Sequence, residues 1–129
     1  MKIDGGCHCG AIRYAASVSP KLVTICHCTD CQRISGAPYR VNVRVLRENF
    51  QLNGEPNHYV KIGSSGDEVV TTFCGTCGSA LYSFKEGNDF VNLRLGGISQ
   101  RTPLAPTGQG FCGSALPWAF DIRGVAKVS

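Results

Sequence analysis

The chain has 129 residues, a length that favours a single domain spanning residues 1–129. Hydrophobic residues make up 43% of it and no apolar run approaches the ~20 residues of a membrane-spanning helix, so the composition argues against disorder and against a bilayer span. The net charge of +4 comes from 13 Lys and Arg residues that never stand side by side, which argues against a nucleic-acid partner because such surfaces cluster their basic residues.

Alternation of apolar and polar residues predicts β-strands along most of the chain. In chain order, the predicted strands lie near residues 12–18, 22–26, 39–45, 58–62, 69–73, 80–84, 91–95 and 118–122. The pattern is clearest at 39–45 and 91–95, where apolar side chains recur at every second position. We therefore expect an all-β fold with one short helix, built from packed antiparallel sheets or a barrel-like arrangement.

One helix is predicted, at residues 30–35. The segment Thr29-Asp30-Cys31-Gln32 matches a capping box, in which Thr29 is the N-cap and Gln32 reaches back to its amide. Gly36 is placed to end the helix, and Pro38 prevents it from resuming.

The polar face of the predicted strand 39–45 carries Arg40, Asn42 and Arg44. We expect this face to be solvated. The alternative is that the three side chains meet a small anionic ligand.

Eight cysteines dominate the sequence: Cys7 and Cys9, then Cys26, Cys28 and Cys31, then Cys74 and Cys77, and finally Cys112. The N-terminal residues show no apolar stretch typical of a secretory signal, so we expect a cytoplasmic protein. In a reducing compartment, clustered cysteines are more often metal ligands than disulfides. A disulfide within a C-x-C would also close a strained ring.

The seven clustered cysteines divide into four and three. Cys7, Cys9, Cys74 and Cys77 form two distant pairs, which together would make a closed, tetrahedral structural zinc site. On an extended strand the two sulfurs of a C-x-C lie on one side, so the intervening His8 and His27 are poor candidates for ligands.

The triplet Cys26, Cys28 and Cys31 supplies only three thiolates and leaves a fourth position for water or substrate, as catalytic zinc sites do. A sulfur-rich site suits a soft ligand such as a substrate thiol. The alternative is that all seven cysteines are structural and that Cys112 closes the second site. Otherwise Cys112 is expected to be a buried free cysteine.

Three motifs resemble those of the glutathione-dependent formaldehyde-activating (GFA) family, which includes the domain found in the vertebrate centromere protein V. They are Gly6-Cys7-His8-Cys9-Gly10-Ala11-Ile12-Arg13-Tyr14, Cys26-His27-Cys28-Thr29-Asp30-Cys31-Gln32-Arg33 and Phe73-Cys74-Gly75-Thr76-Cys77-Gly78-Ser79. The resemblance implies a mainly β "tent" fold with two zinc ions. It assigns Cys7, Cys9, Cys74 and Cys77 to structural zinc, and Cys26, Cys28 and Cys31 to catalytic zinc.

The activity that the resemblance implies is carbon–sulfur lyase chemistry, which joins formaldehyde to glutathione and catalyses the reverse reaction. The expected partners are then a small-molecule thiol and a small carbonyl compound. Arg40, Arg44 or Arg33 could pair with substrate carboxylates.

Two other functions stay open at this point. One is a zinc-stabilised binding module without enzymatic activity. The other is a redox enzyme resembling methionine-sulfoxide reductases, in which Cys112 would be the nucleophile.

Overall fold

The computed structural model describes residues 1–129 and consists of two β-sheets, one α-helix and four 3₁₀ turns. The smaller sheet has the strand order β1-β2-β5 and is antiparallel, with β1 at Lys2–Gly6, β2 at Arg13–Ser17 and β5 at Phe50–Asn53. No helix has the length and apolar character needed to cross a membrane.

The larger sheet has seven strands in the order β10-β3-β4-β9-β8-β7-β6. Their bounds are β3 Val23–Cys26, β4 Arg40–Leu46, β6 Asn57–Ile62, β7 Glu68–Phe73, β8 Ala80–Phe84, β9 Phe90–Arg94 and β10 Gly108–Gly110. All neighbours are antiparallel except β10 and β3, which are parallel. The expected all-β class with one short helix is therefore confirmed, with one parallel pair added.

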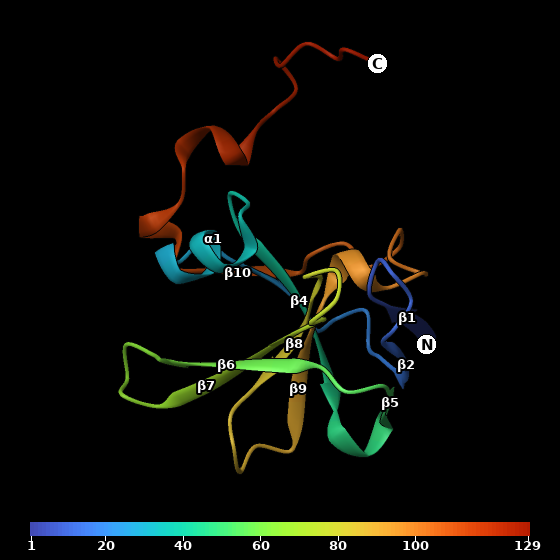
Figure 1. Cartoon of the computed structure of the whole chain (residues 1–129). Coiled ribbons are helices and arrows are strands. Elements are labelled where there is room, and N and C mark those ends of the chain that lie inside the picture. The colour runs from blue at the N-terminus through green and yellow to red at the C-terminus, as the bar shows by residue number, and fades with distance from the viewer.

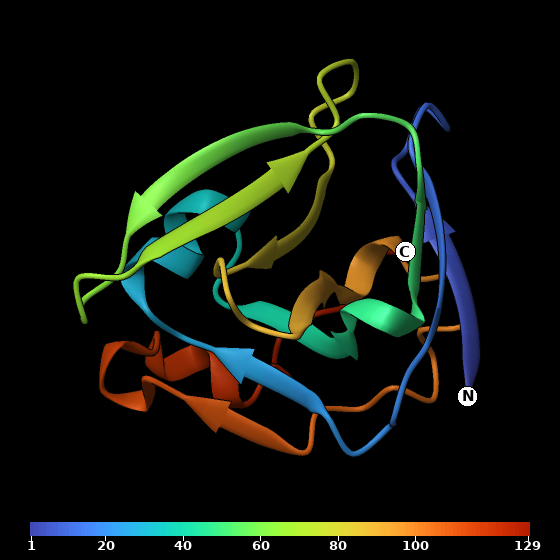
Figure 2. The ribbon, with the colours of Figure 1, turned by 90° about the horizontal axis from the view of Figure 1, so that it is seen from below.

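The larger sheet curls around the interior of the molecule. Figure 2 shows β6 and β7 on one side of the interior, β3 and β10 on the opposite side, and the smaller sheet along a third side. The chain after β10 forms two 3₁₀ turns, Cys112–Ser114 and Pro117–Phe120, and its last residues extend away from the sheets (Figure 1).

The hydrophobic core is shared by both sheets and is centred on β4 and β9. Val43 and Leu93 face each other across these strands and are both 0% exposed. An isolated bridge between Gly5 and Ile98 ties β1 to the segment that follows β9. A β-carbon on Gly5 would overlap the carbonyl oxygen of Gly97, so glycine is required at this close approach.

All predicted strands are present except one. The segment 118–122 is not a strand: residues Pro117–Phe120 form a 3₁₀ turn, whose first position suits the fixed φ angle of proline. Three short strands, β1, β5 and β10, were not predicted. In β1 and β10 the glycines give little strand propensity, and it is pairing with β2 and β3 that makes these segments strands.

The predicted helix is present as α1, Thr29–Ser35, and it ends as predicted, at Gly36 with a φ of 65°. Its N-cap, however, is Cys28 and not Thr29. The Cys28 Sγ accepts a hydrogen bond from the backbone N–H of Cys31 at 3.2 Å. A cysteine sulfur thus takes the place that a hydroxyl or carboxylate oxygen usually has at a helix start.

The capping box is also absent, because Gln32 turns elsewhere. Its side-chain amide donates to the carbonyl oxygens of His27, at 2.9 Å, and Ser114, at 3.0 Å. Gln32 therefore fastens the chain after β10 onto the start of α1.

Truncation of the central core residue Leu93 to alanine should lower the free energy of unfolding by about 2–5 kcal/mol, because it leaves a cavity where the structure cannot collapse. Urea denaturation measures the change. Leu46→Ala, in the neighbouring strand and 41% exposed, is the matched control and should cost less than about 1 kcal/mol. Equal losses in the two variants would contradict this placement of the core.

Candidate metal centres

Four cysteines that are far apart in the sequence converge at one point. The sulfurs of Cys7, Cys9, Cys74 and Cys77 all lie within 4.8 Å of one another. The Sγ–Sγ distance is 3.6 Å between Cys7 and Cys9 and 3.7 Å between Cys9 and Cys74. We call this group the four-cysteine cluster.

Two turns present these sulfurs. Cys7 and Cys9 do not lie on an extended strand as expected, but in a turn after β1, closed by a hydrogen bond from the Gly10 N–H to the Cys7 carbonyl at 3.2 Å. The second turn follows β7 and is the tight C-x-x-C-G turn that was predicted. Its Gly78 has a φ of +78° and donates to the Cys74 carbonyl at 2.8 Å.

Hydrogen bonds to sulfur act in both directions in this cluster. Against a backbone hydrogen bond at Ala11 that lowers it, burial and hydrogen bonds with the other three sulfurs raise the pKa of Cys9 to about 11, whereas Cys77 favours the thiolate. The backbone N–H of Ile12 donates to the Cys7 Sγ at 3.2 Å, and that of Thr76 donates to the Cys74 Sγ at 3.4 Å. A hydrogen bond with the Ser79 side chain is the main cause that lowers the pKa of Cys77 to about 5. Thiolates are the form in which cysteines bind metals.

The four-cysteine cluster has the geometry and the donor set of a tetrahedral metal site. Zinc–thiolate bonds of about 2.3 Å in a tetrahedron place neighbouring sulfurs about 3.8 Å apart. The measured 3.6 and 3.7 Å lie close to this value. A soft divalent cation such as zinc therefore fits between the sulfurs, with all its positions filled by protein.

The second group, which we call the three-cysteine cluster, is local. Cys26 is the last residue of β3, Cys28 is the N-cap of α1, and Cys31 lies in the first turn of α1 with 1% of its surface exposed. Their sulfurs also lie within 4.8 Å of one another, and no fourth cysteine, histidine or carboxylate joins them. The cluster can hold a metal ion that keeps one position free.

The three sulfurs share their protons unequally. A hydrogen bond with the Cys31 side chain is the largest cause that lowers the pKa of Cys26 to about 5, while the same bond raises the pKa of Cys31 above its ordinary value. The positive charge of Arg40 also lowers the pKa of Cys26. Arg40 is the residue directly opposite Cys26 in the pairing of β3 with β4.

The two histidines between the paired cysteines lie outside both clusters. His8 is exposed, and its backbone N–H donates to the Ser79 Oγ at 3.1 Å. His27 is buried, and its Nε2 lies 2.8 Å from the Oε1 of Gln109 in β10.

Cys112 also lies outside both clusters. It is exposed, in the 3₁₀ turn Cys112–Ser114, so the expectation of a buried free cysteine is wrong. The turn is held against α1 by the backbone of Ser114, which leaves Cys112 at the surface.

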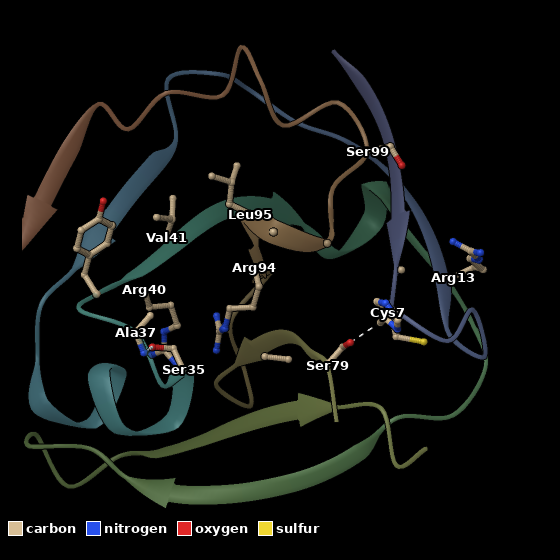
Figure 3. A pocket seen from close by; sticks show the side chains of 16 residues that line it. Cys7, Arg13, Ser35, Ala37, Arg40, Val41, Ser79, Arg94, Leu95 and Ser99 are labelled. Carbon is tan, nitrogen blue, oxygen red and sulfur yellow. Dashed lines mark hydrogen bonds between the residues drawn. The ribbon is translucent and has the colours of Figure 1, made fainter. Parts of the chain in front are cut away.

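A pocket of about 660 Å³ lies beside the clusters. Its lining includes Cys7 from one cluster and Arg40, the neighbour of Cys26 in the other (Figure 3). The expectation of a solvated face on β4 is wrong for Arg40, which is only 7% exposed because α1 and β9 flank β4 here. Arg44 is exposed as expected, and its guanidinium lies 3.9 Å from the centre of the Phe90 ring.

Arg94, which also lines the pocket, was not among the expected site residues. It is 8% exposed and lies on β9 between Leu93 and Leu95. The sequence shows it only as one polar position in an alternating strand. The strand pairing that brings it next to Asn42 and Arg40 is a tertiary feature.

These features define a β protein with two cysteine clusters suited to metal ions. The family described as glutathione-dependent formaldehyde-activating enzyme (GFA) matches residues 2–114, and the chain belongs to this family.

Two individual proteins can be compared with the chain. A Halomonas elongata protein, named provisionally as a glutathione-dependent formaldehyde-activating enzyme, is 28% identical over 89 residues, which are 65% of this chain and 57% of that protein. The match thus spans little more than half of the relative's length. The crystal structure of a Rhodobacter sphaeroides protein is similar with a TM-score of 0.63 and 18% identity, over 82% of this chain and 98% of that one, which shows a shared fold.

The two clusters predict how the protein binds metal. Elemental analysis of the purified protein should find two zinc ions per chain, and Cys74→Ser should remove one of them. Because Cys74 joins segments far apart in the sequence, its loss should also cost about 4 kcal/mol of unfolding free energy, by analogy with a cross-link of that span.

The control is Cys112→Ser, which should keep both ions and full stability because Cys112 touches neither cluster. A Cys74→Ser variant that retains two ions would disprove the assignment.

Proposed function

We propose that the protein is a zinc-dependent carbon–sulfur lyase. It adds a thiol, glutathione or a similar compound, to formaldehyde or another small carbonyl compound, and it catalyses the reverse reaction. Membership of the glutathione-dependent formaldehyde-activating family supports this proposal, as does the name of the Halomonas elongata relative.

The observation that carries the proposal is the difference between the two clusters. The four-cysteine cluster surrounds its centre with protein sulfurs, which is the pattern of a structural site. The three-cysteine cluster offers one ligand fewer, which is the pattern of a catalytic site that accepts a substrate.

The proposed reaction forms one bond between sulfur and carbon. The thiol loses its proton, its sulfur attacks the carbonyl carbon, and the carbonyl oxygen takes up a proton to become a hydroxyl group. In reverse, the hydroxyl proton leaves, the carbon–sulfur bond breaks and the aldehyde departs. A zinc ion held by Cys26, Cys28 and Cys31 supplies Lewis acidity that favours the thiolate form of the substrate.

The chain's own residues prepare this site. Cys26 and Cys28 are fixed at the end of β3 and at the cap of α1, two rigid elements that hold their sulfurs in place. The Cys31 N–H donates to the Cys28 sulfur, and the charge of Arg40 favours the Cys26 thiolate. The Cys26 thiolate is the form that binds a metal.

Neither alternative function draws support from a specific contact. Cys112 makes no side-chain hydrogen bond, so nothing around it activates a thiol nucleophile as a reductase would need. Two of the three arginines of the pocket, Arg40 and Arg94, are buried in a concave site, a placement that suits a small molecule better than a macromolecular surface.

Replacement of Cys28 by serine should reduce the exchange of thiol and formaldehyde with their adduct by more than about 100-fold, because even residues that only orient metal ligands contribute about 10–100-fold. Serine is a favourable N-cap, so α1 and the fold should persist, with one zinc ion left at the four-cysteine cluster.

The measurement is the rate of interconversion above the spontaneous reaction, by nuclear magnetic resonance exchange. Cys112→Ser is the control and should keep the wild-type rate. Full activity in Cys28→Ser would refute the proposed role of the three-cysteine cluster.

A further inference from the structure

Arg40 and Arg94 are buried positive charges without a carboxylate partner. They are 7% and 8% exposed, and neither takes part in any of the protein's three salt bridges. Charged side chains are rarely buried unless an opposite charge or a ligand compensates them. Two such residues in one pocket call for an explanation.

Their hydrogen bonds are incomplete. The Nη1 of Arg94 donates to the Oδ1 of Asn42 at 2.7 Å and to the backbone carbonyl of Asn92 at 3.2 Å, which fixes its side chain. Arg40 donates no hydrogen bond, and its Nε and Nη1 are buried without any acceptor. Because more than 90% of buried polar groups in proteins are paired, these donors indicate that an acceptor from outside the chain belongs here.

The strand register places both arginines next to the three-cysteine cluster. Arg40 lies opposite Cys26, and Arg94 lies opposite Asn42, two residues further along β4. Residues two apart on a strand share a face, so both guanidinium groups are on the same side of the sheet. Figure 3 shows the two side chains extending into the same part of the pocket, near Ser35.

The pocket offers no carboxylate of its own. Its 16 lining residues include three arginines but no aspartate or glutamate, and its volume of about 660 Å³ suits a small molecule. Burial and the nearby charge of Arg40 lower the pKa of Arg94 to about 9. A lowered pKa is expected for a cation whose positive charge is not balanced by a nearby negative charge.

We propose that Arg40 and Arg94 form a carboxylate-binding subsite, which selects thiols that carry an acid group a short distance from the sulfur. The proposal rests on the proposed function, which supplies the thiol. Arg40 has buried donors without an acceptor, and a carboxylate supplies both acceptor oxygens and a negative charge that offsets a buried guanidinium. Planar guanidinium groups are well suited to hold it through paired hydrogen bonds.

The test compares two thiols of the same shape, 3-mercaptopropionate and its uncharged amide, 3-mercaptopropionamide. Calorimetry with the zinc-loaded wild-type protein should show about 10- to 100-fold tighter binding of the acid, the effect of hydrogen bonds to a charged group. In Arg94→Gln the acid should bind no more tightly than the amide, while the affinity for the amide stays the same. Arg40→Gln should likewise remove the preference for the acid.

Arg44→Gln is the matched control, since Arg44 lies on the same strand but is exposed at the surface. This variant should keep the full preference for the acid. Equal affinities of the two thiols for the wild-type protein would overturn the subsite, even if the glutamine variants failed to fold. So would an Arg94→Gln variant that weakens both thiols alike and loses zinc, because the arginines would then only support the metal ligands.

Turnover of the same thiols with formaldehyde separates this inference from the proposed function. Equal binding of acid and amide, with turnover of both, would refute the subsite and leave the lyase activity standing. Selective binding of the acid without any turnover would support the subsite and refute the lyase activity. If neither thiol binds, both proposals fail.

Discussion

The convergence of four sulfurs at one point is the constraint on which the rest of the structure depends. Cys7 and Cys9 follow β1 in the smaller sheet, whereas Cys74 and Cys77 follow β7 in the larger one. The cluster therefore lies where the two sheets meet, beside a core to which both contribute. Four thiolates this close would repel one another strongly without a cation between them, so a metal ion bound here would stabilise the closed fold.

The three-cysteine cluster, in contrast, is formed by residues close together in the sequence. Its sulfurs come from a single stretch, the end of β3 and the start of α1, so it needs no distant partner to form. The larger sheet adds positive charge beside this cluster. The pairing of β3 with β4 and of β4 with β9 places Arg40 and Arg94 on the face of the sheet to which Cys26 belongs. The charge of Arg40 lowers the pKa of Cys26, so the sheet changes the electrostatics of the cluster.

The pocket is lined by residues from both parts of the structure. One of its sides belongs to the segment that carries Cys7, and another to the strands that carry Arg40 and Arg94. Ligand sites placed on rigid elements hold their groups more precisely than sites on loops. The hydrogen bond from Arg94 to Asn42 shows such support, because it fixes one guanidinium while leaving its other nitrogens free. The two buried arginines and Cys26 thus come from three different strands, β4, β9 and β3.

The sequence by itself determined the β class, most of the strands, the helix near residue 30 and the division of the cysteines, because period-two alternation and cysteine spacing are local signals. Only the tertiary structure decided which polar residues are buried. Arg40 and Arg44 look alike in the sequence, yet one is covered and the other is not, and Arg94 gains its place through pairing with a distant strand.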